Sequence, residues 1–194
     1  MIIMRKAQKS RKTHETEVKV DVNLDGEGNY IIDTGLKFLD HMLESFTIHG
    51  LFDLEIKVRG DLEVDDHHTI EDVGITFGKA FKKALSDKKG IKRMAHAIVP
   101  MDESIAMVAV DLGGRAYTVL DMEFEREKIG DISTENIPHF IDSFAKNAKI
   151  NIHAKVKGKN DHHKIEALFK ALAIALKNAV KIEHQKIPST KGNL

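Results

Sequence analysis

Hydrophobic and polar residues alternate along the first part of the chain. Residues 5–11 and 13–23 follow a two-residue period, which is typical of half-buried β-strands. Residues 25–29 contain two glycines and predict a turn, and residues 30–32 resume the strand pattern. We therefore expect the strands over residues 13–23 and 30–32 to form a β-hairpin.

A period of three to four residues marks the helices. Apolar side chains recur at this spacing in residues 38–46, 70–85, 137–148 and 164–182, which predicts four amphipathic helices. Gly50 is expected to end the first helix. The remaining apolar runs predict strands at residues 51–58, 95–99, 104–111, 116–122 and 150–157. Polar segments predict loops at residues 60–65, 86–90 and 123–134.

The second half of the chain repeats the first. The segment His-Met-Leu-Glu-Ser-Phe at residues 41–46 matches His-Phe-Ile-Asp-Ser-Phe at residues 139–144. This self-similarity predicts two copies of one strand–strand–helix–strand–helix unit, about residues 1–88 and 89–194, fused into a single domain. Each unit would cover one face of its sheet with helices, so we expect an α+β fold with helices packed between two outer sheets.

One short motif occurs in both halves. Residues 66–71 and 161–166 each read Asp-His-His-x-Ile-Glu and lead into a predicted helix. Side chains three or four positions apart share a helix face, so His67 and Glu71 should point the same way with His68 beside them. The same spacing holds for His162, His163 and Glu166. Imidazole nitrogens and carboxylate oxygens together form a ligand set for divalent transition metals.

The repeat adds two further histidines to this set. His41 and His139 occupy equivalent positions, so each half offers three histidines and one glutamate. The candidate metal ligands are therefore His41, His67, His68, Glu71, His139, His162, His163 and Glu166. They suffice for two metal ions, and a set without sulfur suits Mn, Fe, Co or Zn. The alternative is a solvated histidine-rich surface, but duplication of the whole pattern favours a metal site.

Composition narrows the class of protein. The chain has no cysteine, which excludes disulfides, thiolate metal sites and a cysteine nucleophile. Its 30 Lys and Arg residues balance its 30 Asp and Glu residues, which argues against a general nucleic-acid binder. Residues 1–12 lack the apolar core of a signal peptide, and lysines interrupt the apolar run over residues 167–180. We therefore expect a cytoplasmic protein with no membrane partner.

Several segments carry a resemblance to a known family. They are Phe-Leu-Asp-His-Met-Leu at 38–43, His-Gly-Leu-Phe-Asp at 49–53, Asp-Asp-His-His-Thr-Ile-Glu-Asp at 65–72, Asp-His-His-Lys-Ile-Glu-Ala at 161–167 and Ser-Thr-Lys-Gly-Asn-Leu at 189–194. From about Arg11 to Leu194 the chain resembles the imidazoleglycerol-phosphate dehydratases of histidine biosynthesis. It departs from them at Ser45, where members usually carry a glutamine thought to help hold the substrate phosphate.

The resemblance implies a fold and an assembly. Each half should be similar to domain 2 of ribosomal protein S5, with helices between two four-stranded sheets. The family forms assemblies of 24 identical subunits, with active sites where subunits meet and two Mn²⁺ ions per site but no organic cofactor. The eight candidate ligands match the metal ligands of the family. Because several helices and more than one subunit contribute, we expect metal binding to promote assembly.

The implied reaction is the dehydration of imidazole glycerol phosphate to imidazole acetol phosphate and water. The hydrogen to be removed lies on a carbon with no adjacent carbonyl, so an ordinary base could not take it. Holding the ring as imidazolate between two cations would let it expel the neighbouring hydroxyl and give a diazafulvene intermediate. A carboxylate would then take the proton, and the resemblance assigns this role to Glu15.

The resemblance also implies which residues bind the substrate. A phosphate needs cationic and hydroxyl donors, and the residues at the matching positions are Arg93, Arg115, Ser189 and Lys191. His49 matches a position near the substrate, and its repeat partner is Asn147, so it is specific to the first half. Without the resemblance, Glu15, Arg93 and Arg115 would be interpreted as solvated surface residues.

Two other functions would use the same metal ligands. A binuclear metallohydrolase would activate water for phosphoester cleavage. A metal-buffering protein would need the ligands alone and would give no role to the Ser-Thr-Lys segment at residues 189–191. A nucleic-acid role is suggested only by the S5-like half, and the balanced charge gives it no support.

Overall fold

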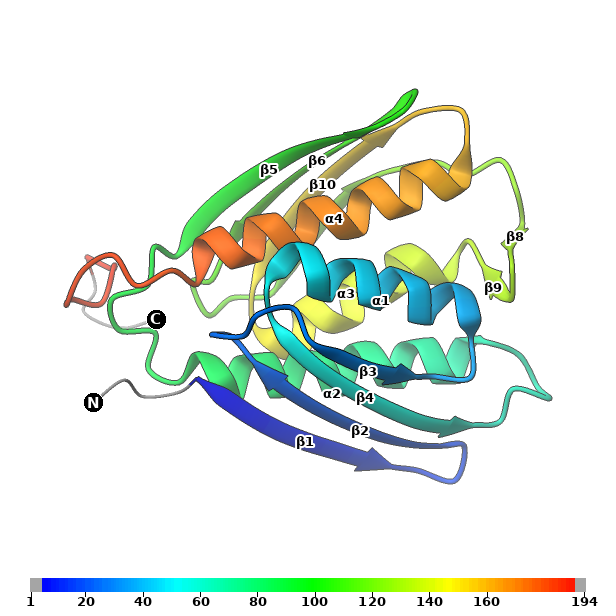
Figure 1. Ribbon diagram of the computed structural model, residues 1–194, viewed down its shortest axis with the longest axis horizontal. Coiled ribbons are helices and arrows are strands. Elements are labelled where there is room, and N and C mark those ends of the chain that lie inside the picture. The colour runs from blue at the N-terminus through cyan, green and yellow to red at the C-terminus, as the bar shows by residue number, and fades with distance from the viewer. Residues whose placement is uncertain (1–4, 191–194) are drawn as a thin grey trace.

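Two four-stranded sheets enclose four helices (Figure 1). The computed structural model describes residues 5–190. The first half contains β1 (Lys6–Lys12), β2 (Thr16–Asn23), β3 (Tyr30–Asp33), α1 (Lys37–Gly50), β4 (Asp53–Gly60) and α2 (His67–Leu85). The second contains β5 (Met94–Met101), β6 (Ser104–Asp111), β7 (Tyr117–Asp121), β8 (Lys128–Ile129), β9 (Ile132–Ser133), α3 (Asn136–Ala148), β10 (Asn151–Lys157) and α4 (Asp161–Ala179).

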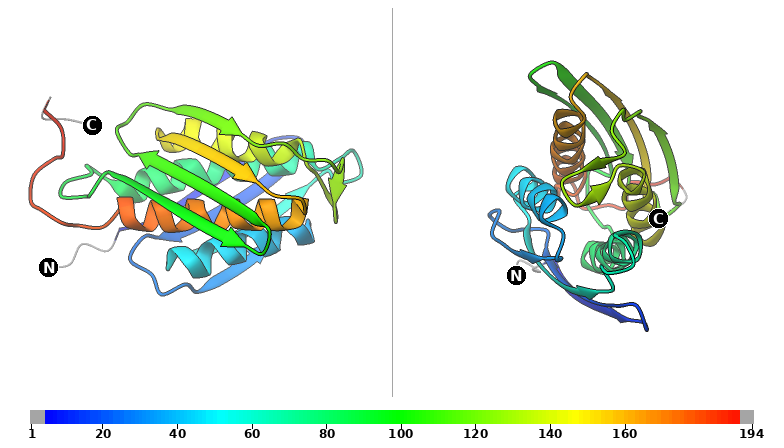
Figure 2. Two further views of the ribbon diagram at one scale, coloured as in Figure 1. Left: turned by 90° about the horizontal axis from the view of Figure 1, so that it is seen from above. Right: turned by 90° about the vertical axis from the view of Figure 1, so that its right-hand side faces the viewer.

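The helices form the middle of the molecule, as Figure 2 shows in the view along their axes. α1 and α2 cover the first sheet, α3 and α4 cover the second, and the two helix pairs meet as α1 on α4 and α2 on α3. The rings of Phe77 and Phe144 lie 4.9 Å apart where α2 crosses α3. The α+β architecture with helices between two outer sheets is confirmed. In the described residues, no helix is long and apolar enough to cross a membrane.

Glycine permits the close approach of α2 and α3. A Cβ atom added to Gly78 would lie 2.5 Å from the Phe144 carbonyl oxygen and 2.9 Å from the Ala148 nitrogen. Any larger residue would therefore push the two helices apart. This contact fixes the distance between the faces of α2 and α3, and both helices carry candidate metal ligands at their N-terminal ends.

The expected hairpin between residues 13–23 and 30–32 is wrong. β3 pairs in parallel with β4, and β4 lies between it and β2, so the sheet order is β1-β2-β4-β3. The hairpin partner of β2 is β1, which pairs with it antiparallel from Lys6–Asn23 to Lys12–Glu17. A buried central position suits the strand with the more regular apolar alternation, and that strand is β4.

The predicted repeating unit lacked one strand. The second sheet has the order β5-β6-β10-β7, which corresponds to that of the first sheet. Each half therefore runs strand–strand–strand–helix–strand–helix. β3 and β7 match the strands predicted at residues 30–32 and 116–122, which the predicted unit did not include. The loop expected over residues 123–134 also contains a short antiparallel pair, β8 and β9.

Both motif-bearing helices begin three residues earlier than predicted. The Asp65 carboxylate accepts a hydrogen bond from the backbone N–H of His67 at 2.8 Å, and the side chain of Asn160 accepts one from the N–H of His162 at 2.9 Å. These side chains supply acceptors for N–H groups that a helix start leaves unpaired. The histidine pairs therefore lie in the first helical turn. α4 also ends at Ala179 rather than Ile182, because the chain turns there to pair with residues 90–93.

Candidate metal centres

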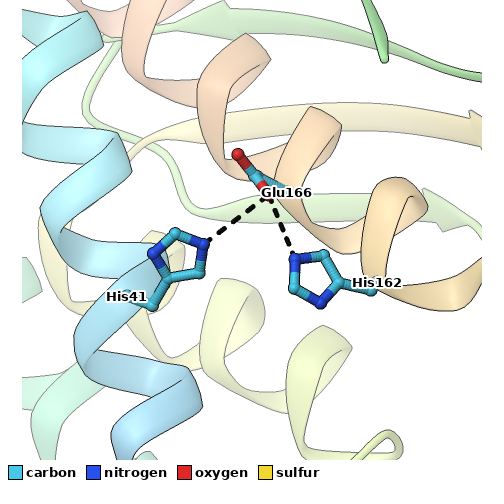
Figure 3. Close-up of side chains that lie close together, drawn as sticks. All are labelled: His41, His162 and Glu166. Carbon is cyan, nitrogen blue, oxygen red and sulfur yellow. Dashed lines mark hydrogen bonds and ion pairs between the residues drawn. The ribbon is translucent and has the colours of Figure 1, made fainter. Parts of the chain in front are cut away.

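Three candidate ligands meet where α1 packs on α4. We call His41, His162 and Glu166 the α1–α4 cluster. The Glu166 Oε2 atom lies 3.2 Å from Nε2 of His162 and 3.6 Å from Nε2 of His41. Figure 3 shows both rings turned toward this carboxylate, His41 from α1 and His162 from α4. The rings of Phe38 and His162 pack edge to face, with centroids 5.1 Å apart.

The carboxylate of the α1–α4 cluster is held as an anion. Glu166 is buried, and burial alone would raise the pKa of its carboxyl. Hydrogen bonding to the Lys170 ammonium, 2.7 Å from Oε1, and to His162 outweighs burial, so the pKa of Glu166 lies below its usual value. Glu166 therefore offers a charged ligand at neutral pH.

A second group forms where α2 packs on α3. We call His67, Glu71 and His139 the α2–α3 cluster. Nε2 of His139 lies 3.3 Å from Oε1 of Glu71, and the rings of His67 and His139 stack with centroids 4.7 Å apart. The Asn136 side chain contacts Nδ1 of His67 at 3.0 Å and donates to the Asp66 carboxylate at 3.0 Å. This chain of contacts fixes the orientation of the His67 ring and leaves its Nε2 for a ligand.

Both clusters fit a divalent cation. In each, the three ligand atoms lie within 4.8 Å of one another. Bonds of about 2.1 Å require ligand atoms roughly 3–4 Å apart, which small side-chain rotations would provide. The Nε2 atom of His139 is buried, and it has no hydrogen-bond partner in the part of the chain that the structure describes. A metal ion bound in this cluster would satisfy that buried nitrogen.

Each cluster combines both halves of the chain. His41 from the first half joins His162 and Glu166 from the second, and His139 from the second half joins two residues of the first. The sequence leaves open which ligands share an ion, and the structure groups them across the two halves. The physical reason is the helix packing, because α1 contacts α4 and α2 contacts α3 in the middle layer.

His68 and His163 lie outside both clusters. Nδ1 of His68 contacts Asp61 at 3.0 Å, and Nδ1 of His163 contacts Glu103 at 2.9 Å. These carboxylates raise the pKa of each imidazole, since they stabilise its protonated form. His68 was expected beside His67 and Glu71, and it contacts Asp61 instead, since adjacent positions on a helix point about 100° apart. Nε2 of His68 lies 3.8 Å from Oε1 of Glu15, and Nε2 of His163 lies 3.7 Å from Oδ2 of Asp102.

Glu15 lies in the turn between β1 and β2, close to His68. Its Oε1 atom is 3.8 Å from Nε2 of His68, and its side chain is 52% exposed. The equivalent residue of the second half is Glu103, since Thr16 and Ser104 occupy the same register in the two sheets. Glu103 accepts hydrogen bonds from the backbone N–H of Lys159 and Asn160 and contacts His163. The Glu15 carboxylate therefore has fewer partners than that of Glu103, whose side chain is 35% exposed.

The described residues among those expected at the phosphate lie at the opposite end of the molecule from the clusters. The backbone N–H of Arg93 donates to the Ala179 carbonyl at the last residue of α4, whereas His162 lies in the first turn of that helix. A helix of 19 residues is about 28 Å long. The loop with Arg115 starts at Leu112, which donates to the Arg93 carbonyl, and Ser189 follows Pro188, which Arg93 also contacts. Lys191 is outside the described residues.

His49 and Ser45, which were also named from the sequence, both lie in α1. His49 is about two turns along α1 from His41, and partial burial together with the nearby Lys170 lowers the pKa of its imidazole. Ser45 is buried within α1. Sequence reasoning missed Asn136 and Phe38, the neighbours of His67 and His162. They occupy equivalent positions in the repeat, so the repeat alignment could have pointed to both.

Comparison with known proteins identifies the family. Residues 34–176 match the family described as imidazoleglycerol-phosphate dehydratase. The chain belongs to this family. It is 62% identical over 194 residues to the imidazoleglycerol-phosphate dehydratase of Methanothermobacter thermautotrophicus, with all of both chains covered. It is 57% identical over 192 residues to that of Methanocella arvoryzae, covering 98% of this chain and 100% of the relative.

Solved structures of the family share the fold. The imidazoleglycerol-phosphate dehydratase of Staphylococcus aureus aligns with a TM-score of 0.83 at 36% identity, covering 91% of this chain and 99% of the other. The enzyme from Pyrococcus furiosus aligns with a TM-score of 0.83 at 34% identity, covering 95% of this chain and 99% of the other. The family resemblance seen in the sequence is thereby confirmed along nearly the whole chain.

Proposed function

We propose that this protein dehydrates imidazole glycerol phosphate to imidazole acetol phosphate and water, a step of histidine biosynthesis. Membership of the dehydratase family supports the hydro-lyase class. The observation that carries the proposal is the pair of clusters, each with two histidines and one glutamate, built at equivalent helix crossings. A substrate with an imidazole ring has two nitrogens, which matches two metal centres that each retain an open position.

We infer that the two centres hold Mn²⁺. Imidazole and carboxylate ligands without sulfur suit this ion, although Fe, Co and Zn accept the same set. His41, His162 and Glu166 would hold one ion, and His67, Glu71 and His139 the other. When bound, the two cations would stabilise the substrate ring as an anion and so favour loss of the neighbouring hydroxyl.

Glu15 is the residue that we propose as the general base. Its carboxylate is accessible, whereas the equivalent Glu103 is occupied by backbone N–H groups and His163. A base needs a lone pair that can reach the proton, so only the first-half glutamate suits this role. It would take the proton from the substrate carbon next to the one that loses its hydroxyl.

The proposed active site requires more than one copy of the chain. The metal clusters lie at the N-terminal ends of α2 and α4, and Arg93 lies about 28 Å away at the far end of α4. This distance is much longer than the substrate. His68 and His163, which belong to neither cluster of their own chain, would complete the centres of neighbouring copies. We propose that such contacts build the 24-subunit assembly of the family, in the cytoplasm.

The test is a dehydratase assay on protein stripped with a chelator, before and after Mn²⁺ is added. We expect no activity without metal, recovery with Mn²⁺, and a matched increase in particle size by light scattering. Glu15→Gln should keep metal binding and assembly but lose most of its kcat. Failure of Mn²⁺ to restore activity would refute the manganese proposal. Release of inorganic phosphate without imidazole acetol phosphate would identify a metallohydrolase instead.

A further inference from the structure

Arg93 connects three segments at one end of the molecule. Its Nε and Nη2 atoms donate to the two carboxylate oxygens of Asp111 at 2.7 and 3.1 Å, and Nη1 donates to the Pro188 carbonyl at 2.7 Å. The pair is partly shielded from solvent, with the side chains 19% and 29% exposed. A bidentate, shielded arginine–carboxylate pair has a fixed geometry, unlike an exposed surface pair.

The backbone of Arg93 is held in a costly conformation. Its φ of 76° lies in the left-handed region, which residues other than glycine rarely adopt. Two backbone hydrogen bonds keep it there, one to the Ala179 carbonyl at 2.9 Å and one from Leu112 at 3.1 Å. Such conformations persist where the surrounding structure fixes them, and they concentrate at functional sites.

The first half contains an arginine at the equivalent position. Arg5 precedes β1 as Arg93 precedes β5, and Leu24 donates to its carbonyl as Leu112 does to that of Arg93. Arg5 pairs with Asp25 through Nε at 3.0 Å, and its Nη1 donates to the Val180 carbonyl at 2.5 Å. Each half therefore contributes one arginine that donates to the segment after α4, residues 180–190. Arg5 donates to Val180 and Arg93 donates to Pro188.

The two arginine contacts lie at different parts of that segment. Backbone pairing already holds its first part, since Lys92 donates to the Lys181 carbonyl at 2.8 Å and Gly90 to the Lys186 carbonyl at 3.0 Å. Arg5 contacts the segment at the beginning of this paired region. Arg93 contacts it two residues beyond Lys186, directly before Ser189. Of the two arginine contacts, that of Arg93 is therefore the one next to the Ser-Thr-Lys sequence.

We propose that Asp111 is a positioning residue for substrate phosphate. By orienting Arg93, it sets both the guanidinium and the segment that contains Ser189. This inference rests on the proposed function. Arginine has five N–H donors, and the contacts to Asp111 and Pro188 use three of them, so two remain for phosphate oxygens. Asp111 also lies at the end of β6, four residues before Arg115.

The experiment compares Asp111→Asn with Asp25→Asn in the Mn²⁺-loaded enzyme. The second variant is the matched control, because it removes the carboxylate partner of the other arginine. We expect Asp111→Asn to raise the KM for imidazole glycerol phosphate and the inhibition constant of inorganic phosphate by roughly tenfold, the loss typical of one charged hydrogen bond. Its kcat should stay within about twofold, and Asp25→Asn should change neither constant. Unchanged constants in Asp111→Asn, or equal changes in both variants, would overturn the proposal.

A second variant, Gly113→Ala, tests the same role if Asp111→Asn does not fold. A Cβ atom added at Gly113 would lie 2.9 Å from Nη2 of Arg93 and 3.0 Å from both carboxylate oxygens of Asp111. Gly113→Ala should displace the ion pair without removing a charge and raise the same two constants by a smaller factor. If Gly113→Ala changes neither constant, the positioning role is wrong.

Failure of the proposed function would give a different result. In that case the wild-type protein would show no dehydratase activity. Binding of inorganic phosphate, measured by calorimetry on the same proteins, would still test the role of Asp111. A fall in phosphate affinity in Asp111→Asn but not in Asp25→Asn would support it without reference to the reaction. Equal affinity in both variants would overturn it.

Discussion

The ring of His139 stacks on the ring of His67, with centroids 4.7 Å apart and an angle of 21° between the planes. The two residues are 72 positions apart and belong to different halves of the chain. The contact exists because α2 packs on α3. The corresponding packing of α1 on α4 brings His41 to His162. Neither half by itself can therefore form a complete metal centre.

The crossed arrangement predicts the effect of removing one histidine. His139→Ala should lower the metal content from two ions per chain to about one, because it takes a ligand from the α2–α3 cluster alone. Activity should fall by at least about 100-fold, since the proposed reaction needs both ions. Elemental analysis of protein equilibrated with Mn²⁺ gives the stoichiometry. Retention of two ions at wild-type affinity would show that His139 is not a ligand.

The neighbours of the two clusters predict that two equivalent substitutions change metal affinity by different amounts. Asn136 contacts His67 through a hydrogen-bonding side chain, whereas the equivalent Phe38 contacts His162 only with its ring edge. Asn136→Ala should weaken the α2–α3 cluster about 10- to 100-fold, as loss of an orienting partner commonly does. Phe38→Leu is the matched control and should leave both affinities within about threefold. Calorimetric titration with Mn²⁺ resolves the two sites, and equal weakening by both variants would contradict the role of Asn136.

The close contact of α2 with α3 predicts a loss of stability in Gly78→Ala. The added methyl group would meet the backbone of Phe144 and Ala148 at less than 3 Å, and backbone atoms cannot rotate away. We expect the free energy of unfolding of the metal-free protein to fall by about 1–3 kcal/mol. Urea denaturation measures this change. Lys79→Ala, an exposed site one position along the same helix, should stay within about 0.5 kcal/mol of wild type.

The Arg5–Asp25 pair predicts a dependence of stability on pH. Hydrogen bonding to Arg5 lowers the pKa of the Asp25 carboxyl below its ordinary value of 3.8. The folded state therefore holds this proton less tightly than the unfolded chain, and the pair stabilises the fold above pH 3.8. That contribution is lost as the pH falls through the lowered pKa. Since Asp25 is about one-third exposed, it should amount to less than about 1 kcal/mol.

The measurement compares wild type with Asp25→Asn in urea at several pH values. The difference in free energy of unfolding should be largest near pH 7 and should disappear in strongly acidic solution. An equal difference at pH 7 and pH 3 would show that the carboxylate charge is not its source. The same Asp25→Asn variant also serves as the kinetic control for Asp111→Asn.

The helices were predictable because their signal is local. Apolar residues at a spacing of three to four placed all four helices, and the Asp65 and Asn160 side chains account for the three-residue error at two of the starts. Strand existence was equally local, as the alternation in β2 and β6 shows. The order of the strands could not be predicted from local pattern. β3 has too few residues to specify its partner, and it lies beside β4 only because of the layered packing.

The candidate ligands and their duplication followed from the sequence by itself. Residue type determines which atoms can bind a metal, and the match between the two halves was enough to add His41 and His139 to the set. Tertiary structure alone decided how these residues combine. It joined His41 to Glu166 and His139 to Glu71, moved His68 and His163 out of both groups, and separated Arg93 from the clusters by the length of α4. The physical reason is that spacing along a helix fixes only directions on that helix, whereas a centre shared by two helices depends on which faces they bury against each other.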